Sequence, residues 1–291
     1  MSTQLPHPTL VAPANPAHAL RLAARTATHT SPTAGYAPGH IQANLLVLPS
    51  AYANDFRLLC LRNPVPCPLL AISASTGSAT SVTPNHLFST PFDIRTDIPR
   101  YNIYNAGKLV ESSITDLKSH WTNDHVAFLI GCSFSFEGAL EAAGLPPRHV
   151  VKKCNVSMYK TTLPLCPAGV FTDGTFVVSM RPYKKEDVER VRDITRPFRE
   201  MHGEPIAWGW EGAKRLGIED VSKPDFGDAV EVRDGEVPVF WGCGVTPQAV
   251  VMAAGDKIKG NVLAHEPGHM MILDVREEEW FGRTAKREGR L

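Results

Sequence analysis

The chain lacks several features that would assign it quickly to a class of proteins. Its 30 basic and 30 acidic residues balance, and no stripe of lysine and arginine alternates with aromatic residues, which argues against nucleic acid as a partner. No apolar run approaches the roughly 20 residues that cross a bilayer, so no membrane partner is expected either. With 43% hydrophobic residues in a chain of 291, the composition predicts a soluble globular protein with a sizeable core.

Cysteine is sparse, and the spacing of the six cysteines excludes two common uses. No CxxC pair exists, so a structural zinc site is not indicated, and the density is too low for a disulfide scaffold. Neither a P-loop nor a GxGxxG motif is present, so neither ATP nor a dinucleotide is expected. The sequence therefore predicts a chain in a reducing compartment that uses no cofactor and no metal.

The first 54 residues contain no aspartate or glutamate, are rich in serine and threonine, and carry Arg21 and Arg25. This composition is also typical of organelle transit peptides. The cytoplasm is the expected location, with the mitochondrial matrix as the alternative. Residues 1–18 and 277–291 are expected to be flexible ends.

A pattern of strand, bend and helix occurs twice, 111 residues apart. The stretches FLIGCSFSFEGALEAAG, from Phe128, and VFWGCGVTPQAVVMAAG, from Val239, share a Gly-Cys bend and a terminal Ala-Ala-Gly. A helix that starts at such a bend directs its free N–H groups and its dipole toward the end of the strand, where an anion can bind. Two bends in one sheet would suit a substrate with two carboxylates. A purely structural role is the alternative, because most strand-to-helix turns bind nothing.

The order of strand-like and helix-like segments predicts an α/β fold in two parts. Segments 19–149 and 235–276 have strands followed by helices and are expected to form a discontinuous main α/β domain. Segment 150–234 has short β-like runs and a charged helix, and it is expected to form a smaller, inserted α+β domain.

Cys132 and Cys243 occupy the place in each bend where a nucleophile would stand. A helix N-terminus lowers the pKa of a thiol. However, the motif GxSxG is absent and both cysteines have apolar neighbours, so burial as small hydrophobic groups is the alternative. The backbone N–H groups around Ser133 and Gly244 are better candidates, as donors that stabilise an oxyanion.

The string HEPGH, from His265 to His269, matches the zinc-protease motif HExxH letter for letter. The match is rejected because Pro267 and Gly268 would break the continuous helix that two such zinc ligands need. The flanking apolar runs instead predict a turn between two strands that presents two imidazoles. This pair is the candidate general acid and base, with simple solvation of the turn as the alternative.

Arg95 and Arg181 lie beside β-like segments, where a guanidinium can hold a carboxylate through two hydrogen bonds. Each is equally suited to an ion pair with an acidic residue of the chain. Asn63 and Asn155 are candidates either for binding a substrate through hydrogen bonds or for ending a helix.

Several stretches together resemble the hydro-lyase family that includes D-glutamate cyclase. They include PTAGYAPGHIQANLLVLP, DIRTDIPRYNIYNAGKLV, VAFLIGCSFSFEGALEAAGLPPRHV, FVVSMRP and HEPGHMMILD, and they extend from about Arg25 to Asp274. The resemblance implies a main α/β domain with a smaller α+β domain, and conversion of D-glutamate to 5-oxo-D-proline with loss of water. The chain departs from the family pattern at Glu266, where a small residue is usual.

The partner that this resemblance implies is a small dicarboxylate, and assembly into a homo-oligomer is left open. Two alternatives remain at this point. One is a hydro-lyase that acts on another small dicarboxylate or on a hydroxy acid, and the other is a non-catalytic dicarboxylate-binding protein. Two titratable histidines at one turn favour catalysis over binding.

Overall fold

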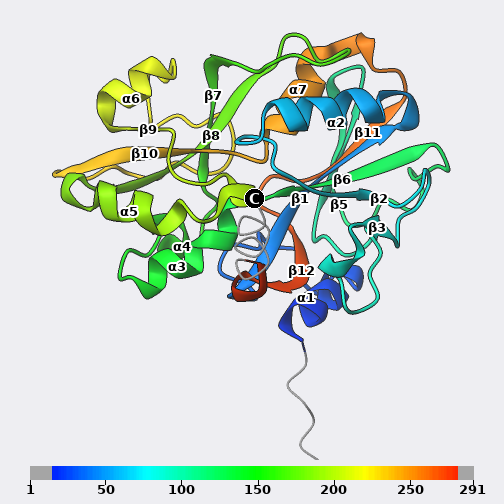
Figure 1. The fold of residues 1–291 in the computed structure, drawn as a ribbon, viewed down its shortest axis with the longest axis horizontal. Coiled ribbons are helices and arrows are strands. Elements are labelled where there is room, and N and C mark those ends of the chain that lie inside the picture. The colour runs from blue at the N-terminus through cyan, green and yellow to red at the C-terminus, as the bar shows by residue number, and fades with distance from the viewer. Residues whose placement is uncertain (1–14, 281–291) are drawn as a thin grey trace, which may run out of the picture.

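The structure is a computed structural model, and it describes residues 15–280. Its strands are β1 (His40–Pro49), β2 (Leu69–Ser73), β3 (Val82–Thr83), β4 (Tyr101–Asn105), β5 (Lys108–Ile114), β6 (His125–Gly131), β7 (Ser157–Pro164), β8 (Thr175–Lys184), β9 (Ala207–Trp208), β10 (Glu236–Gly242), β11 (Asn261–His265) and β12 (Met271–Arg276). They form two sheets that meet near the middle of the molecule (Figure 1). The mixed α/β class predicted from the sequence is confirmed.

The larger sheet has the order β3-β2-β6-β1-β11-β4-β5, with β12 also paired to β1, and the smaller sheet has the order β7-β8-β10-β9. All strand pairings in the described part of the chain are antiparallel. The larger sheet takes its strands from residues 40–131 and 261–276, and the smaller from residues 157–242. The smaller sheet is thus built from a continuous stretch of the chain.

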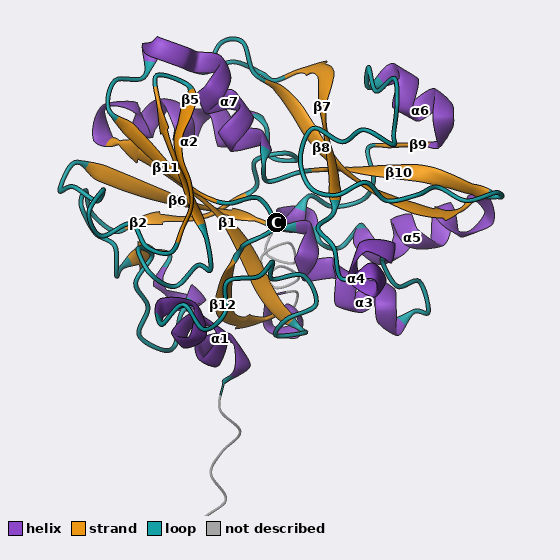
Figure 2. Cartoon of the chain, turned by 180° about the vertical axis from the view of Figure 1, so that it is seen from behind, coloured by secondary structure: helices purple, strands orange, loops and turns teal. Residues whose placement is uncertain are grey.

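The helices are α1 (Pro16–Arg25), α2 (Ala53–Arg62), α3 (Glu137–Ala142), α4 (Arg148–Lys152), α5 (Val188–Thr195), α6 (Gly209–Arg215) and α7 (Thr246–Ala254). Short 3-10 helices are η1 (Ser50–Tyr52), η2 (Asn85–Leu87), η3 (Ser133–Phe136), η4 (Lys185–Asp187), η5 (Arg199–Met201) and η6 (Gly255–Lys257). Helices α2 and α7 lie together against the larger sheet, whereas α3, α4 and α5 lie beside the smaller one (Figure 2). None of the helices within residues 15–280 is both long enough and apolar enough to cross a membrane.

Strand β1 is the centre of the larger sheet and is buried along its whole length. Its side chains alternate between two cores, as the two-residue period of a strand requires. Leu45 and Val47 face a core shared with β10 and α5, and Leu46 and Leu48 face a second core that includes side chains of α2 and α7. Burial on both faces explains why the second half of β1, from Leu45 to Pro49, is continuously apolar, whereas its first half alternates apolar residues with the buried polar residues His40, Gln42 and Asn44.

Helix α1 begins at Pro16, so the last residues of segment 1–18, which was expected to be flexible, are helical. The side chain of Asn15 accepts hydrogen bonds from the first free N–H groups, and a proline follows at the first position of the helix. Arg21 and Arg25, the two arginines of the acid-free stretch, form ion pairs of 2.8 Å with acidic side chains of the fold. The remainder of the expected flexible N-terminal segment and residues 281–291 lie outside the described residues.

The expectation that both bends leave one sheet is wrong. Strand β6 belongs to the larger sheet, whereas β10 pairs with β8 along its whole length and belongs to the smaller one. Helix α7, which follows the second bend, returns to the core of the larger sheet. The sequence pattern indicated a strand and a helix at each place, but the partner of a strand is decided by contacts with distant segments.

Candidate functional site

Both repeated bends begin with a glycine because another segment passes close to the backbone there. A Cβ on Gly131 would lie 1.7 Å from the carbonyl oxygen of Glu200, and one on Gly242 would lie 3.1 Å from that of Val65. The first distance is far inside van der Waals contact and the second is tight. A side chain is therefore excluded most strictly at Gly131.

Cys132 is the N-cap of the 3-10 helix η3, whereas Cys243 stands two residues before Val245, the N-cap of α7. Cys132 Sγ accepts a hydrogen bond from the N–H of Phe134 over 3.5 Å, and Cys243 Sγ interacts in the same way with the N–H of Val245. Burial raises the pKa of the Cys243 thiol to about 11, and it also raises the pKa of the Cys132 thiol. Both sulfurs are neutral thiols near neutral pH, which favours a structural role over nucleophilic attack.

The two bends meet across Asn44, a polar residue in the middle of β1. Its Nδ2 donates to the carbonyl oxygen of Gly131 over 2.8 Å, and a Cβ on Gly244 would lie 1.8 Å from the same nitrogen. Met270, which follows the histidine turn, packs in one cluster with the cysteines of both bends. The bends and the turn therefore lie together where the two sheets meet. The sequence signal for Asn44 was a polar amide directly before the apolar run from Leu45 to Pro49.

Arg181 of β8 is fully buried at this junction, and the protein itself uses its donors. Its Nε donates to Glu137 Oε1 over 3.0 Å, and its Nη2 and Nη1 donate to the hydroxyls of Ser133 and Ser179 over 3.0 and 3.1 Å. His149 Nε2 lies 3.0 Å from the same carboxylate oxygen. Burial acts to raise the pKa of Glu137, but the charges of His149 and Arg181 outweigh it and lower the pKa below its usual value.

Arg95 and Asn63 lie apart from this junction network. Arg95 pairs with Asp93 two residues away, at 2.7 Å, within a turn. Asn63 Nδ2 donates to the carbonyl oxygens of Leu59 and Cys166, and its Oδ1 accepts from the N–H of Cys166, so the side chain joins the end of α2 to a distant loop. In this structure both side chains have structural contacts.

His265 fills a gap in the hydrogen-bond ladder of β1. This strand pairs with β11 up to the histidine turn and with β12 after it, and the turn itself leaves the sheet. The backbone of Leu45 lies opposite the gap, where the imidazole Nδ1 of His265 is 3.1 Å from its N–H nitrogen and 3.0 Å from its carbonyl oxygen. A buried N–H without an acceptor is costly, so the Nδ1 lone pair has a clear structural use.

A chain of hydrogen bonds through polar side chains leads to His265. The N–H of Ser113 donates to Asn102 Oδ1 over 3.2 Å, which leaves the Asn102 amide as the donor toward Tyr104. Tyr104 Oη donates to Gln248 Oε1 over 3.0 Å. Gln248 Nε2 donates to the carbonyl of His265 over 2.8 Å and lies 3.2 Å from its Nδ1. Nδ1 of His265 therefore faces two N–H donors, from Leu45 and Gln248, and also the carbonyl oxygen of Leu45 at 3.0 Å.

The two imidazoles of the turn are both buried and neutral. Burial lowers the pKa of His265 to about 4, and it also lowers the pKa of His269. The Nε2 of His265 and the Nδ1 of His269 have no hydrogen-bond partner within the described residues. His29, His40 and His202 also have a buried ring nitrogen without a hydrogen-bond partner among the described residues, so the feature that distinguishes His269 is its place in the lining of a large polar cavity.

A cavity of about 520 Å³ opens beside His269, between the larger sheet and the segment around residue 226 that pairs with β7. We call it the His269 pocket. Its polar lining consists of Asn102, Tyr104, Ser112, Ser113, Asn155, Asp228, Glu266 and His269. Neither lysine nor arginine is among the described residues that line it, and the side chains of His265 and of both bends lie behind its wall.

Asn155 and His269 are the two sequence candidates that the structure brings into the same pocket. Asn155 Nδ2 donates to the carbonyl of Pro267 over 3.0 Å, so this side chain also supports the histidine turn. The two carboxylates of the lining are held from the side, since Glu266 accepts from the hydroxyl of Ser113 over 2.7 Å and Asp228 accepts from the N–H of Asn155 over 2.7 Å. The pocket thus combines neutral amides and hydroxyls with an imidazole and two acids.

No group of three or more His, Cys, Asp or Glu side chains within residues 15–280 is arranged to hold a metal ion. Apart from Asn155 and His269, the lining was not foreseen from the sequence. Asn102 and Tyr104 lie in one of the stretches that resemble the family, and Gln248, which does not line the cavity, lies in the second bend pattern, but nothing in either pattern singled out these side chains.

The fold and the site define an α/β protein of two antiparallel sheets with a polar, enzyme-like cavity at their junction. A family described as "D-glutamate cyclase" matches residues 126–274 of the chain. Relatives that share about half of the sequence come from Schizosaccharomyces pombe (51% identity over 84% of this chain and 80% of the relative), Bordetella pertussis (48%, 92% and 92%) and Rubrobacter xylanophilus (49%, 88% and 94%). Each of these relatives is named "putative hydro-lyase". The chain therefore belongs to the D-glutamate cyclase family, which confirms the resemblance seen in the sequence.

Among solved structures, the chain is similar to the crystal structure of a nitrogen repressor-like protein from Methanococcus jannaschii. The TM-score is 0.37 and the sequence identity 13%, over 90% of this chain and 96% of the other.

Proposed function

We propose that the chain is a hydro-lyase that closes D-glutamate into 5-oxo-D-proline in the His269 pocket. The match to the D-glutamate cyclase family and the names of the relatives support this reaction class. The observation that carries the choice of site is an imidazole with an unpartnered nitrogen at the wall of a polar cavity. The Arg95 and Arg181 clamps expected from the sequence have no part in this proposal, because neither side chain lines the cavity.

The reaction forms one bond from the α-amine nitrogen to the γ-carboxyl carbon and breaks one carbon–oxygen bond. The ammonium group gives up two protons in total, and both leave with the departing oxygen as water. One base that takes a proton from nitrogen and returns it to oxygen can therefore serve both transfers. Because the two reacting groups belong to one molecule, holding it in a curled conformation lowers the barrier.

His269 is the residue of the lining suited to move that proton. Burial keeps its imidazole neutral, and its Nδ1 has no partner within the described residues. His265 does not line the cavity and is assigned a positioning role, since its ring holds the start of the turn against β1. Asn102, Asn155 and Ser112 are the neutral donors that can meet the carboxylates of the substrate.

The charges of the pocket favour an amino acid over a plain dicarboxylate. Glu266 and Asp228 line the cavity without a cationic residue beside them in the lining, so they would repel a ligand that carried only negative groups. A substrate with an ammonium group can place it against these acids. This argument favours glutamate over the hydroxy acids and dicarboxylates that the sequence left open.

The proposal is tested by incubating the purified protein with D-glutamate and with L-glutamate and following 5-oxoproline by mass spectrometry. The D enantiomer is expected to be converted faster. Replacing His269 by alanine should lower kcat by about 10³-fold, because a positioned base contributes a factor of this order. His120, which is partly exposed and lies 3.6 Å from Glu111, provides the matched control in His120→Ala.

Circular dichroism and the unfolding midpoint establish that both variants are folded. Absence of product, or equal rates for the two enantiomers, would exclude the proposed substrate. Full activity in a folded His269→Ala variant would exclude this histidine as the base. Raised thermal stability with D-glutamate but no product would identify a binding protein instead.

A further inference from the structure

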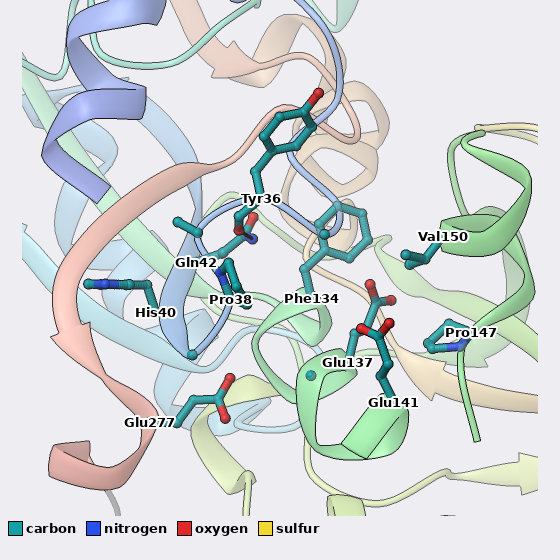
Figure 3. A pocket seen from close by; sticks show the side chains of 14 residues that line it. Tyr36, Pro38, His40, Gln42, Phe134, Glu137, Glu141, Pro147, Val150 and Glu277 are labelled. Atoms are coloured by element: carbon teal, nitrogen blue, oxygen red, sulfur yellow. Dashed lines mark hydrogen bonds between the residues drawn. The ribbon is translucent and has the colours of Figure 1, made fainter. Parts of the chain in front are cut away.

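A second, smaller cavity lies beside α3, in a place that the proposed reaction does not use. We call it the Glu137 pocket; its volume is about 40 Å³, and it is lined by residues 35–42, by Phe134 and the α3 side chains, and by Glu277 (Figure 3). A cavity needs roughly 10–15 Å³ to hold one water-sized group. The Glu137 pocket therefore has room for a head group of about three non-hydrogen atoms.

Three carboxylates line this small space: Glu137, Glu141 and Glu277. Glu137 and Glu141 come from successive turns of α3, and their carboxylates lie side by side in Figure 3. Like charges at this spacing repel one another. Neither lysine nor arginine is among the described residues that line the pocket. No basic side chain of the lining therefore offsets the repulsion between the carboxylates.

In the carboxylate of Glu137, one oxygen is paired with basic side chains and the other has no hydrogen-bond partner within the described residues. Oε1 is held by Arg181 and lies next to His149 Nε2, which keeps the carboxylate ionised. Oε2 is buried and has no hydrogen-bond partner within the described residues, although the residue is only 4% exposed. In Figure 3 this carboxylate is directed between the side chains of Phe134 and Val150, which both line the pocket. A buried, ionised oxygen without a hydrogen bond is costly in free energy, and a ligand that donates a hydrogen bond to it would remove this cost.

The arrangement of the acids distinguishes between kinds of cation. No trio of acidic or other metal-ligating side chains within residues 15–280 converges closely enough to hold a bare metal ion. Of the two aromatic residues that line the pocket, Phe134 has its ring near the Glu137 carboxylate in Figure 3, whereas the Tyr36 ring is directed away from it. An ammonium group carries three N–H donors that can reach separate carboxylates, and its positive charge is attracted to aromatic faces.

We propose that the Glu137 pocket binds a primary ammonium group, carried on a small organic molecule whose remainder extends toward solvent. The ammonium donates to the free Oε2 of Glu137 and to the carboxylate of Glu141, with Glu277 across the cavity. This site is separate from the His269 pocket, and the inference does not depend on the proposed cyclisation.

Binding at this site is expected to strengthen as the pH rises. Burial raises the pKa of Glu277 to about 7. The charged groups around it are Glu137, Glu141 and His40 in the pocket and its chain neighbours Arg276 and Glu278. Because a cation favours the ionised carboxylate, its affinity should increase between about pH 6 and pH 8.

The experiment measures the unfolding midpoint of the whole chain at pH 8 with ethylammonium chloride, and with sodium chloride or tetramethylammonium chloride at equal ionic strength. Ethylammonium at 100 mM should raise Tm by about 2–4 °C, and the other two salts should not. The shift should shrink at pH 6. Because Glu137→Gln would disturb the ion pair with Arg181, the test variant is the double change Glu141→Gln/Glu277→Gln.

That variant should lose the ethylammonium shift, whereas Glu211→Gln, at an exposed position of α6, should keep it. Equal shifts from all three salts would overturn the proposal, since they would show a general ionic effect. A shift that survives in the double variant would also overturn it, because the cation would then bind elsewhere. Activity toward glutamate is not part of this test, so its outcome is independent of that proposal.

Discussion

The His269 pocket is lined by Pro32 and the Glu137 pocket by residues from Gly35 to Gln42 of the same connecting segment, but the polar groups of the two pockets are kept in place by opposite means. Around His269, a chain of neutral hydrogen bonds orders amides, a phenol and imidazoles, and burial keeps the imidazoles uncharged. Around Glu137, a buried ion pair with Arg181 keeps a carboxylate charged. One junction thus supports a neutral site and a charged site, and the stability of the two should respond oppositely to substitution and to pH.

The largest effect is expected from breaking the ion pair of the charged site. Arg181→Met should lower the free energy of unfolding by about 3–5 kcal/mol, because Glu137 would remain buried without its main partner. Adding Glu137→Gln should restore part of the loss, since a neutral amide tolerates burial better than an unpaired charge. Urea unfolding of the two variants measures both quantities. Equal stability of Arg181→Met and the native chain would show that the pair does not carry this part of the fold.

A smaller effect is expected from the neutral site, where His265 should make the folded protein less stable at low pH. The pKa of His265 is lowered to about 4, so the unfolded chain binds more protons than the folded chain between about pH 6.5 and pH 4. Stability should therefore fall as the pH is lowered through this range, by about 2–3 kcal/mol for this group. In His265→Gln the slope should be correspondingly shallower, and in His120→Gln it should be unchanged. An unchanged slope in His265→Gln would mean that this ring is not the group that titrates.

The smallest effect should have the opposite pH dependence. The pKa of Glu277 is raised to about 7, so here the folded chain binds more protons between about pH 4.5 and pH 7, and stability is lost as the pH rises. After allowance for partial exposure, Glu277→Gln should be more stable than the native chain by about 1 kcal/mol at pH 8 and equal to it near pH 4. Thermal unfolding at both pH values measures the difference. A gain that is the same at both values would point to packing instead of charge.

The parts of the fold that depend on local sequence could be predicted. The turn between β4 and β5 has positive φ at both Ala106 and Gly107, a conformation that suits glycine but not alanine, and the helix Ala53–Arg62 ends before an Asn-Pro stop. The turn between two strands that the sequence predicts at HEPGH is confirmed. In each case the signal lies within about ten neighbouring residues.

The parts that depend on distant segments could not be predicted. The second bend has the same pattern as the first, but its strand belongs to the other sheet because it pairs with β8. Arg181 stands 44 residues from Glu137 in the chain, so its sequence neighbours gave no sign that its donors were already used. The links from Tyr104 through Gln248 to His265 join three elements that no motif connects.

The interruption of the ladder beside β1 has a consequence for anyone who wishes to redesign the site. Two strands that do not pair with each other share one neighbour, and an imidazole takes the place of the missing backbone rung. Amide exchange at Leu45 should therefore report on the ring at position 265 as directly as on the sheet. Substitution of residue 265 would therefore change the stability of the fold as well as any catalysis. Residue 269 has its ring in the turn, so it is the better position for altering the chemistry alone.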